Sequence, residues 1–260
     1  MTRLPGPFAA TLLLALVLAA GAAGAAARTA GSPFYLVPSP TSECRNVRNC
    51  IAVTGPWVVI PAHSEATYLL RCPEPTGYEI GGTDARATSS DVRVWFDGQL
   101  GAPIGTPSTH SSGGAVLLFH AVTNSGRPGS FEPILGCVTL KQKSPRSVLS
   151  ARAVASVPGR APGVPLDYRA RLVPIEPGVY YPARFTEEHC PAHERLVGSW
   201  TALTFPAGAP DLAAIGKLTV ARRVRGNYVR GFMPSQAALF GQGGFPVVQV
   251  GAMCQLVSGG

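Results

Sequence analysis

The chain has 260 residues, a formal net charge of +8 and only 14% charged side chains. Its 30 glycines and 25 prolines favour short strands joined by turns and argue against long helices. The positive charge supports solubility and weak attraction to anionic polymers, but it does not by itself specify a partner.

The first 27 residues have the pattern of a signal peptide. An apolar run at residues 9–27 follows a short start whose only charged side chain is Arg3, and small residues at Ala25 and Ala27 fit cleavage before Arg28. The alternative is an uncleaved N-terminal anchor. We therefore expect a secreted or otherwise extracytoplasmic protein, with no transmembrane segment after signal cleavage.

Six cysteines follow the expected signal peptide, and an exported chain would let them pair. Six cysteines allow 15 connectivities. Two Cys-Pro dipeptides, at Cys72 and Cys190, each precede a further cysteine, Cys137 or Cys254, at nearly equal spacing. This repetition favours Cys72 with Cys137 and Cys190 with Cys254, and leaves Cys44 with Cys50 as a local loop.

In the first half, β-like runs are expected at residues 51–53, 57–60, 67–70, 91–96, 115–122 and 131–140. Residues 91–96 alternate between apolar and polar side chains, which indicates a half-buried strand. The run at 115–122 is continuously apolar, as expected for a strand between two layers.

Prolines and arginines without periodicity mark a linker at residues 144–166, within which the segment 147–157 could be helix or strand. Further strands are expected at residues 168–173, 218–224, 228–232 and 246–256. The stretch from Val197 to Ala202 echoes that from Ile80 to Ala85, including a glycine. These echoes predict a divergent tandem repeat.

We therefore predict an all-β protein with two tandem β-sandwich-like domains, at residues 28–143 and 167–260, each with one disulfide. The cysteine spacing is that of an inter-sheet disulfide in an immunoglobulin-like sandwich. Trp95 and Trp200 lie at unequal distances from their cysteines, and Leu135 and Ala252 stand where a tyrosine corner would place tyrosine, so a true immunoglobulin domain is not predicted.

The sequence from Arg71-Cys72-Pro73 through Gly81-Gly82 and Ala121-Val122-Thr123-Asn124 to Cys137 resembles a group of uncharacterised secreted bacterial proteins with repeated Cys-Pro, Gly-Gly and terminal-Cys units. The second stretch, from His189-Cys190-Pro191 to Cys254, resembles them less closely, with Ser199 in place of the second glycine. The resemblance implies export, disulfides and β structure, and it implies no activity.

No sequence motif of a nucleophile elbow, a phosphate loop or a zinc protease occurs. His189 and His193, with Glu187, Glu188 and Glu194 nearby, would share a face only in a helix, which Pro191 opposes, so no metal site and no cofactor are predicted. Asp84, Asp91 and Asp97 could serve a glycosidase if two of them converged. A secreted hydrolase of this kind is the alternative function.

The candidate binding residues are aromatic and basic. Trp57, Trp95, Trp200, Tyr180 and Tyr181 could stack on sugar rings if exposed, and Trp95 and Trp200 are retained as candidates. Arg222, Arg223 and Arg225, with Arg230, form the densest basic run. We predict an exported, non-enzymatic protein that binds an envelope polysaccharide, another anionic polymer or a secreted protein, and not nucleic acid.

Overall fold

The computed structural model describes residues 35–37, 50–73, 78–98, 100, 116–139, 154–155, 157–160, 166–175, 186–215, 220–233 and 245–257. All of them belong to one compact unit, Ser32–Gly260. The regular elements here are strands apart from one short helix, α1 (Leu212–Ile215), which confirms the predicted all-β class. No helix in these ranges is long and apolar enough to cross a membrane. The expected signal peptide lies outside them.

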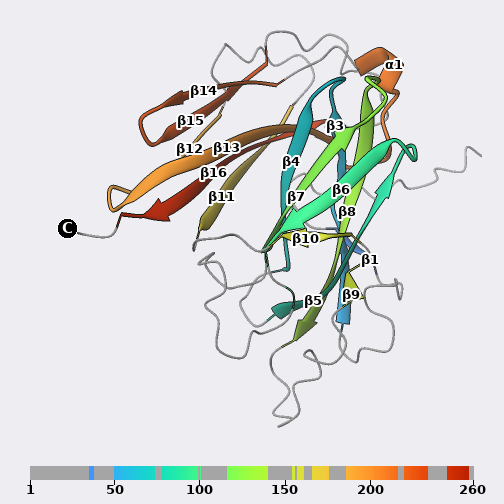
Figure 1. The fold of residues 1–260 in the computed structure, drawn as a ribbon, viewed down its shortest axis with the longest axis horizontal. Coiled ribbons are helices and arrows are strands. Elements are labelled where there is room, and N and C mark those ends of the chain that lie inside the picture. The colour runs from blue at the N-terminus through green and yellow to red at the C-terminus, as the bar shows by residue number, and fades with distance from the viewer. Residues whose placement is uncertain are drawn as a thin grey trace, which may run out of the picture. The chain divides into compact units, whose positions relative to one another are not determined.

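The largest sheet, here called the main sheet, has nine strands among the described residues (Figure 1). Along its main path the order is β1-β2-β8-β3-β13-β16-β11, with β5 on the other side of β8 and β9 beside β5. Its strands are β1 (Tyr35–Val37), β2 (Cys50–Thr54), β3 (Trp57–Ile60), β5 (Tyr78–Ala87), β8 (Gly129–Thr139), β9 (Val154–Ala155), β11 (Asp167–Pro174), β13 (Glu194–Phe205) and β16 (Val247–Leu256).

Two smaller sheets complete the fold. The first side sheet has the order β10-β6-β7-β4, and the second side sheet has the order β12-β15-β14. Their strands are β4 (Glu65–Arg71), β6 (Val92–Asp97), β7 (Val116–Thr123), β10 (Gly159–Arg160), β12 (Thr186–His189), β14 (Ala221–Arg225) and β15 (Tyr228–Phe232).

Each disulfide joins a side sheet to the main sheet. Cys72 directly follows β4 and bonds to Cys137 on β8, and Cys190 directly follows β12 and bonds to Cys254 on β16. Both pairs are those predicted from the repeated spacing. Cys50 is also disulfide-bonded, and its predicted partner Cys44 lies outside the described residues.

The two halves pair their strands in the same order. In the first, β4, β7 and β6 form the side sheet and β5 pairs with β8; in the second, β12, β15 and β14 form the side sheet and β13 pairs with β16. A register shift also falls at matching places, after Ile80 opposite Cys137 and after Leu196 opposite Cys254. Gly198 therefore occupies the position of Gly82, one residue away from the alignment suggested by the sequence echo.

The predicted linker at residues 144–166 contributes strands to the first half. The short strand β9 pairs with β5 in parallel, and β10 pairs with β6 in parallel. Val157, which lies between them, is buried in the first hydrophobic core, which also contains Tyr68 on β4, Phe119 on β7 and Phe131 on β8. This segment therefore adds a short strand to one edge of each sheet of the first half.

The main sheet continues from the first half into the second. The C-terminal end of β13 pairs with β3, with Thr204 opposite Val58 and Phe205 opposite Trp57. The second hydrophobic core contains Phe205 on β13, Val229 on β15 and Val250 on β16. The two cores overlap, because Ala202 on β13 contributes to the first and Val59 on β3 to the second.

A third, smaller core lies between the halves. Leu69 and Leu118 on the first side sheet pack with Tyr168 and Trp200 of the main sheet. Trp200 covers Gly251 on the neighbouring strand, where an added Cβ would overlap the indole ring. Gly251 thus leaves the room that Trp200 needs.

Gln249 provides the polar contact in this interface. Its side chain is 2% exposed, and its Oε1 accepts from the Leu69 amide at 2.7 Å and from Trp200 Nε1 at 2.8 Å. Its Nε2 donates to the Leu69 carbonyl at 3.0 Å. Gln249 therefore satisfies the backbone of Leu69 on β4, which is the edge strand of the first side sheet.

Most strands predicted from periodicity are present, including those at residues 91–96, 115–122 and 131–140. The sequence did not predict β5, β10, β12 or β13. Gly81-Gly82 and Gly198 lower the strand propensity of β5 and β13, and the register shift beside each glycine interrupts the alternation of buried and exposed side chains. Only pairing with β8 and β16 identifies them as strands.

We predict that Gln249→Ala lowers the free energy of unfolding by about 2–4 kcal/mol, because it leaves three buried polar groups without partners. Urea unfolding of the full chain measures the loss. The matched control is Gln255→Ala, on the same strand, whose side chain bonds among the described residues only with the exposed Arg195. A loss from Gln249→Ala no larger than that of the control would contradict the assigned role.

Candidate functional site

The outer face of the second side sheet collects the basic residues that the sequence singled out. Val229 is fully buried in the second core, so its neighbours Tyr228 and Arg230 point to the opposite, outer side. Arg225 lies opposite Tyr228 and Arg223 lies opposite Arg230 in the strand register, which places both on the same side. We call the surface formed by Arg223, Arg225, Tyr228 and Arg230 the basic face.

Aromatic rings accompany the arginines on this surface. Tyr228 is 47% exposed, and its ring stacks on that of His189 with centroids 5.3 Å apart. The guanidinium of Arg223 lies 5.2 Å from the centroid of Phe232, within the range of a cation–π contact. The face thus offers flat apolar surface together with positive charge.

The positive charge of the basic face is only partly compensated. Arg230 pairs with Glu187 on the adjacent strand. Arg223 and Arg225 form no ion pair with any carboxylate among the described residues. Arg222 points away from this face, because it lies opposite the buried Gly231 and donates to the Ser199 carbonyl. Of the three arginines predicted as a group, Arg223 and Arg225 therefore share the face, whereas Arg222 bonds to β13 of the main sheet.

A tight hairpin holds the arginines in place. Gly226 and Asn227 form the two-residue connection between β14 and β15, and Gly226 has a positive φ of 57°, as a type II′ turn requires at its first position. The Asn227 side chain donates to the Glu194 carbonyl at 2.7 Å and accepts from the Leu196 amide at 3.2 Å. The turn is thereby tied to the start of β13.

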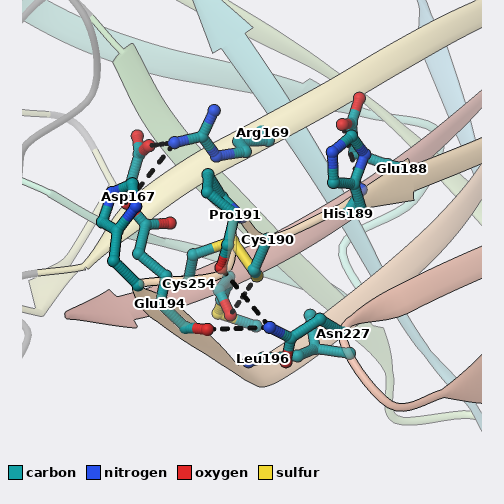
Figure 2. Close-up of a disulfide and its surroundings, with 12 residues drawn as sticks. Asp167, Arg169, Glu188, His189, Cys190, Pro191, Glu194, Leu196, Asn227 and Cys254 are labelled. Atoms are coloured by element: carbon teal, nitrogen blue, oxygen red, sulfur yellow. Dashed lines mark hydrogen bonds and ion pairs between the residues drawn. A yellow bond between two sulfur atoms is a disulfide. The ribbon is translucent and has the colours of Figure 1, made fainter. Parts of the chain in front are cut away.

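The same hairpin supports the surroundings of the second disulfide (Figure 2). Cys190 donates its amide to the Asn227 carbonyl at 3.0 Å, next to the bond from Cys190 to Cys254. On the other side lies Glu194, which is 7% exposed and accepts from Arg169 Nη2 at 3.5 Å. Asp167 also pairs with Arg169, so the buried Glu194 shares its cation.

This disulfide cluster is not a metal centre as it stands. A ligand atom of Glu194 and the sulfurs of Cys190 and Cys254 lie within 4.8 Å of one another, but both sulfurs are bonded to each other. A cysteine binds a metal as its thiolate, and the sulfurs of a disulfide are not thiolates. The sequence also raised a metal site formed by His189 and His193, which would require a helix. The chain instead runs from strand β12 through a turn into β13.

The two tryptophans retained as candidates differ in exposure. Trp200 is 3% exposed in the third core and donates to Gln249, so it presents no surface to a ligand. Trp95 is half-buried on the first side sheet and stacks on His120, with ring centroids 5.5 Å apart and an interplanar angle of 8°. Trp57 packs against the second core, and Tyr180 and Tyr181 lie outside the described residues.

A cluster that the sequence did not predict surrounds His120. Its Nδ1 lies 2.7 Å from Glu65 Oε1, and its Nε2 lies 3.1 Å from Asp97 Oδ2, both within hydrogen-bond distance. Thr67 Oγ1 lies 3.3 Å from Nδ1. Glu65, His120 and Asp97 come from the three adjacent strands β4, β7 and β6. The residues are far apart in sequence, so only strand pairing brings them together.

The electrostatics of the cluster favour a charged imidazole. Burial lowers the pKa of His120, but hydrogen bonds and charge from Asp97 and Glu65 outweigh it, so the pKa is raised from its ordinary value of 6.5. Nearby, burial with a contribution from the Asp97 charge raises the pKa of Tyr168 to about 12. Tyr168 therefore stays neutral over the range in which His120 titrates.

The cluster is a poor general base. Both ring nitrogens of His120 are occupied by carboxylates, so neither is free to take a proton from a substrate. Of the three predicted glycosidase carboxylates, only Asp97 belongs to the cluster. Asp84 lies on β5 in the main sheet and bonds to the Ala85 amide, and Asp91 lies in the turn before β6.

No protein-family model matches the chain, and no curated protein matches its sequence. The arguments on function therefore depend on the geometry of the chain itself.

We predict that His120 stabilises the fold most strongly at low pH. Because the folded pKa is raised, its contribution is fully present below pH 6.5 and is lost as the pH rises through the folded value. Urea unfolding at a series of pH values should show wild type losing stability above pH 6.5 relative to His120→Gln, which cannot titrate. An unchanged difference between the two proteins across the series would contradict the ionic role.

Proposed function

We propose that this chain is an exported, non-enzymatic binding protein whose basic face holds an anionic polysaccharide of the cell envelope. The observation that carries the proposal is the presence of Arg223 and Arg225 on one exposed face without a carboxylate partner among the described residues. They lie next to the half-exposed ring of Tyr228. Guanidinium groups can pair with carboxylate or sulfate groups of a polymer, and an exposed aromatic ring offers apolar surface to a sugar.

Export is supported by the disulfides and by the N-terminal pattern. Disulfides persist in oxidising compartments and are rare in the reducing cytosol of most organisms. The two bonds from Cys72 to Cys137 and from Cys190 to Cys254 are buried. They fit the signal peptide that the sequence predicts at residues 1–27.

We further propose that the binding face sits on one of two tandem, immunoglobulin-like units. Six strands counted from β3 in the first half correspond to six counted from β11 in the second. In each set the second, fifth and fourth strands form one sheet, and the third and sixth strands pair in the other. The disulfide joins the end of the second strand to the sixth, which matches the B-to-F bond of an immunoglobulin sandwich. The first strands, β3 and β11, pair with the sixth, on the side where an immunoglobulin domain has its last strand.

The alternative, a secreted hydrolase, receives less support. The best cluster of titratable groups is that of Glu65, His120 and Asp97, and both ring nitrogens of His120 are occupied within the cluster. A glycosidase needs one carboxyl group that gives up a proton and another that faces the sugar. Here the two carboxylates face the two sides of one imidazole ring.

The binding proposal is tested with a polyuronate, a polysaccharide of carboxylated sugars, and a neutral glucan of similar length. We expect wild type to bind the polyuronate in a salt-sensitive manner and to ignore the neutral glucan. The variant Arg223→Glu/Arg225→Glu should bind about tenfold or more weakly. Isothermal titration calorimetry measures both.

The matched control is Arg93→Glu/Arg127→Glu, which makes the same change in net charge at exposed arginines of the first half. It should retain most of the affinity, since its charges are not on the basic face. Equal weakening in both double variants would show that only net charge matters, and would overturn the assignment to this face. Absence of polyuronate binding by wild type would overturn the proposal itself.

A further inference from the structure

The outer edge of β14 is an unpaired strand edge. In the second side sheet β14 stands at the end of the order β12-β15-β14, and no other strand of the described residues pairs with it. Four of its five residues, from Arg222 to Arg225, are exposed. An open edge of this kind presents backbone donors and acceptors that another chain can pair with.

The equivalent edge in the first half is occupied. There β6 holds the position that β14 holds in the second half, and β10 pairs with it in parallel. The Phe96 amide donates to the Pro158 carbonyl at 3.0 Å, and the Gly98 amide donates to the Arg160 carbonyl at 3.3 Å. This sandwich geometry therefore accommodates a short extended segment added at that edge.

The hairpin register identifies which backbone groups of β14 face outward. Arg225 and Tyr228 flank a two-residue turn and so form a hydrogen-bonded pair, and Arg223 with Arg230 is the next such pair. The amide and carbonyl of Val224 consequently point to the free edge. Val224 lies opposite Val229 on the central strand of its sheet, and Phe96 lies opposite Phe119 on the central strand β7 of the other. Phe96 is the residue of β6 whose amide donates to the segment of β10.

The side chains of β14 define the kind of segment that fits. Arg223 and Arg225 project on the outer face, whereas Val224 projects on the other face and is 53% exposed. An incoming strand with acidic residues beside the two arginines and apolar residues beside Val224 would match both faces. A second copy of β14 would place arginine against arginine, which is unfavourable.

We propose that the free edge of β14 accepts an extended, alternately acidic and apolar segment of a partner protein by strand addition. Backbone hydrogen bonds to Val224 provide the affinity, and Arg223 and Arg225 select an acidic sequence. The proposal goes beyond polysaccharide binding and does not rest on it, because the edge backbone of β14 takes no part in the basic face.

The probe is a short capped peptide of alternating Glu and Val, compared with a block peptide of the same composition. Hydrogen exchange and calorimetry follow binding to the full chain. We expect the Val224 amide to exchange rapidly in the free protein and to become protected when the alternating peptide binds. The block peptide should bind more weakly, because it cannot place its charges on one face.

Two reagents separate backbone pairing from charge. Val224→Pro removes the outward amide without removing a bond to β15, and should weaken peptide binding by about fivefold or more. Val224→Ala keeps the amide and is the matched control. The Val224→Pro variant should still bind polyuronate, so this proposal and the proposed function can fail separately.

If Val224→Pro does not fold, a peptide N-methylated at each residue tests the same bonds from the other side and should not bind. Equal binding of alternating and block peptides would reduce the effect to electrostatics and overturn strand addition. Slow exchange of the Val224 amide in the free protein would show that the chain itself covers this edge, and would also overturn the proposal.

Discussion

The joint between the two halves depends on one buried amide. Gln249 projects from β16 and bonds both backbone groups of Leu69, while its oxygen also accepts from Trp200. Without Gln249, the backbone groups of Leu69 would be buried without hydrogen bonds. The loss of stability from such groups is larger than the net stabilisation that a typical hydrogen bond contributes. The surrounding apolar contacts of Leu118 and Tyr168 contribute buried area to the interface. Gln249 fixes which residue of β4 lies opposite it, because it bonds both backbone groups of Leu69.

This joint also determines what the first side sheet can do. One end of its outer face is covered by the second half at Leu69 and Leu118. Beside the covered end lies the cluster of His120, where Asp97 faces the imidazole and influences the hydroxyl of Tyr168. Asp97 is therefore connected to both halves.

The second side sheet has a different environment. Its inner face contributes Val229 to a core. Among the described residues, Arg223 and Arg225 on its outer face have no carboxylate partner, and the outer edge of β14 pairs with no strand. The hairpin turn at Gly226 and Asn227 is held by bonds to the loop beside Cys190. The hairpin that carries the exposed arginines is therefore linked by hydrogen bonds to the residues around the disulfide.

The sequence by itself determined the all-β class, most of the strands and the two disulfide pairs, because alternation of side chains and repetition of Cys-Pro spacing are local or periodic signals. It did not determine β5 and β13, where glycines and a register shift interrupt the alternation, nor the burial of Trp200. Only the tertiary structure placed Glu65, Asp97 and His120 on one imidazole and Gln249 on the backbone of Leu69. Such contacts depend on strand pairing and sheet packing between residues distant in sequence, and no local pattern records them.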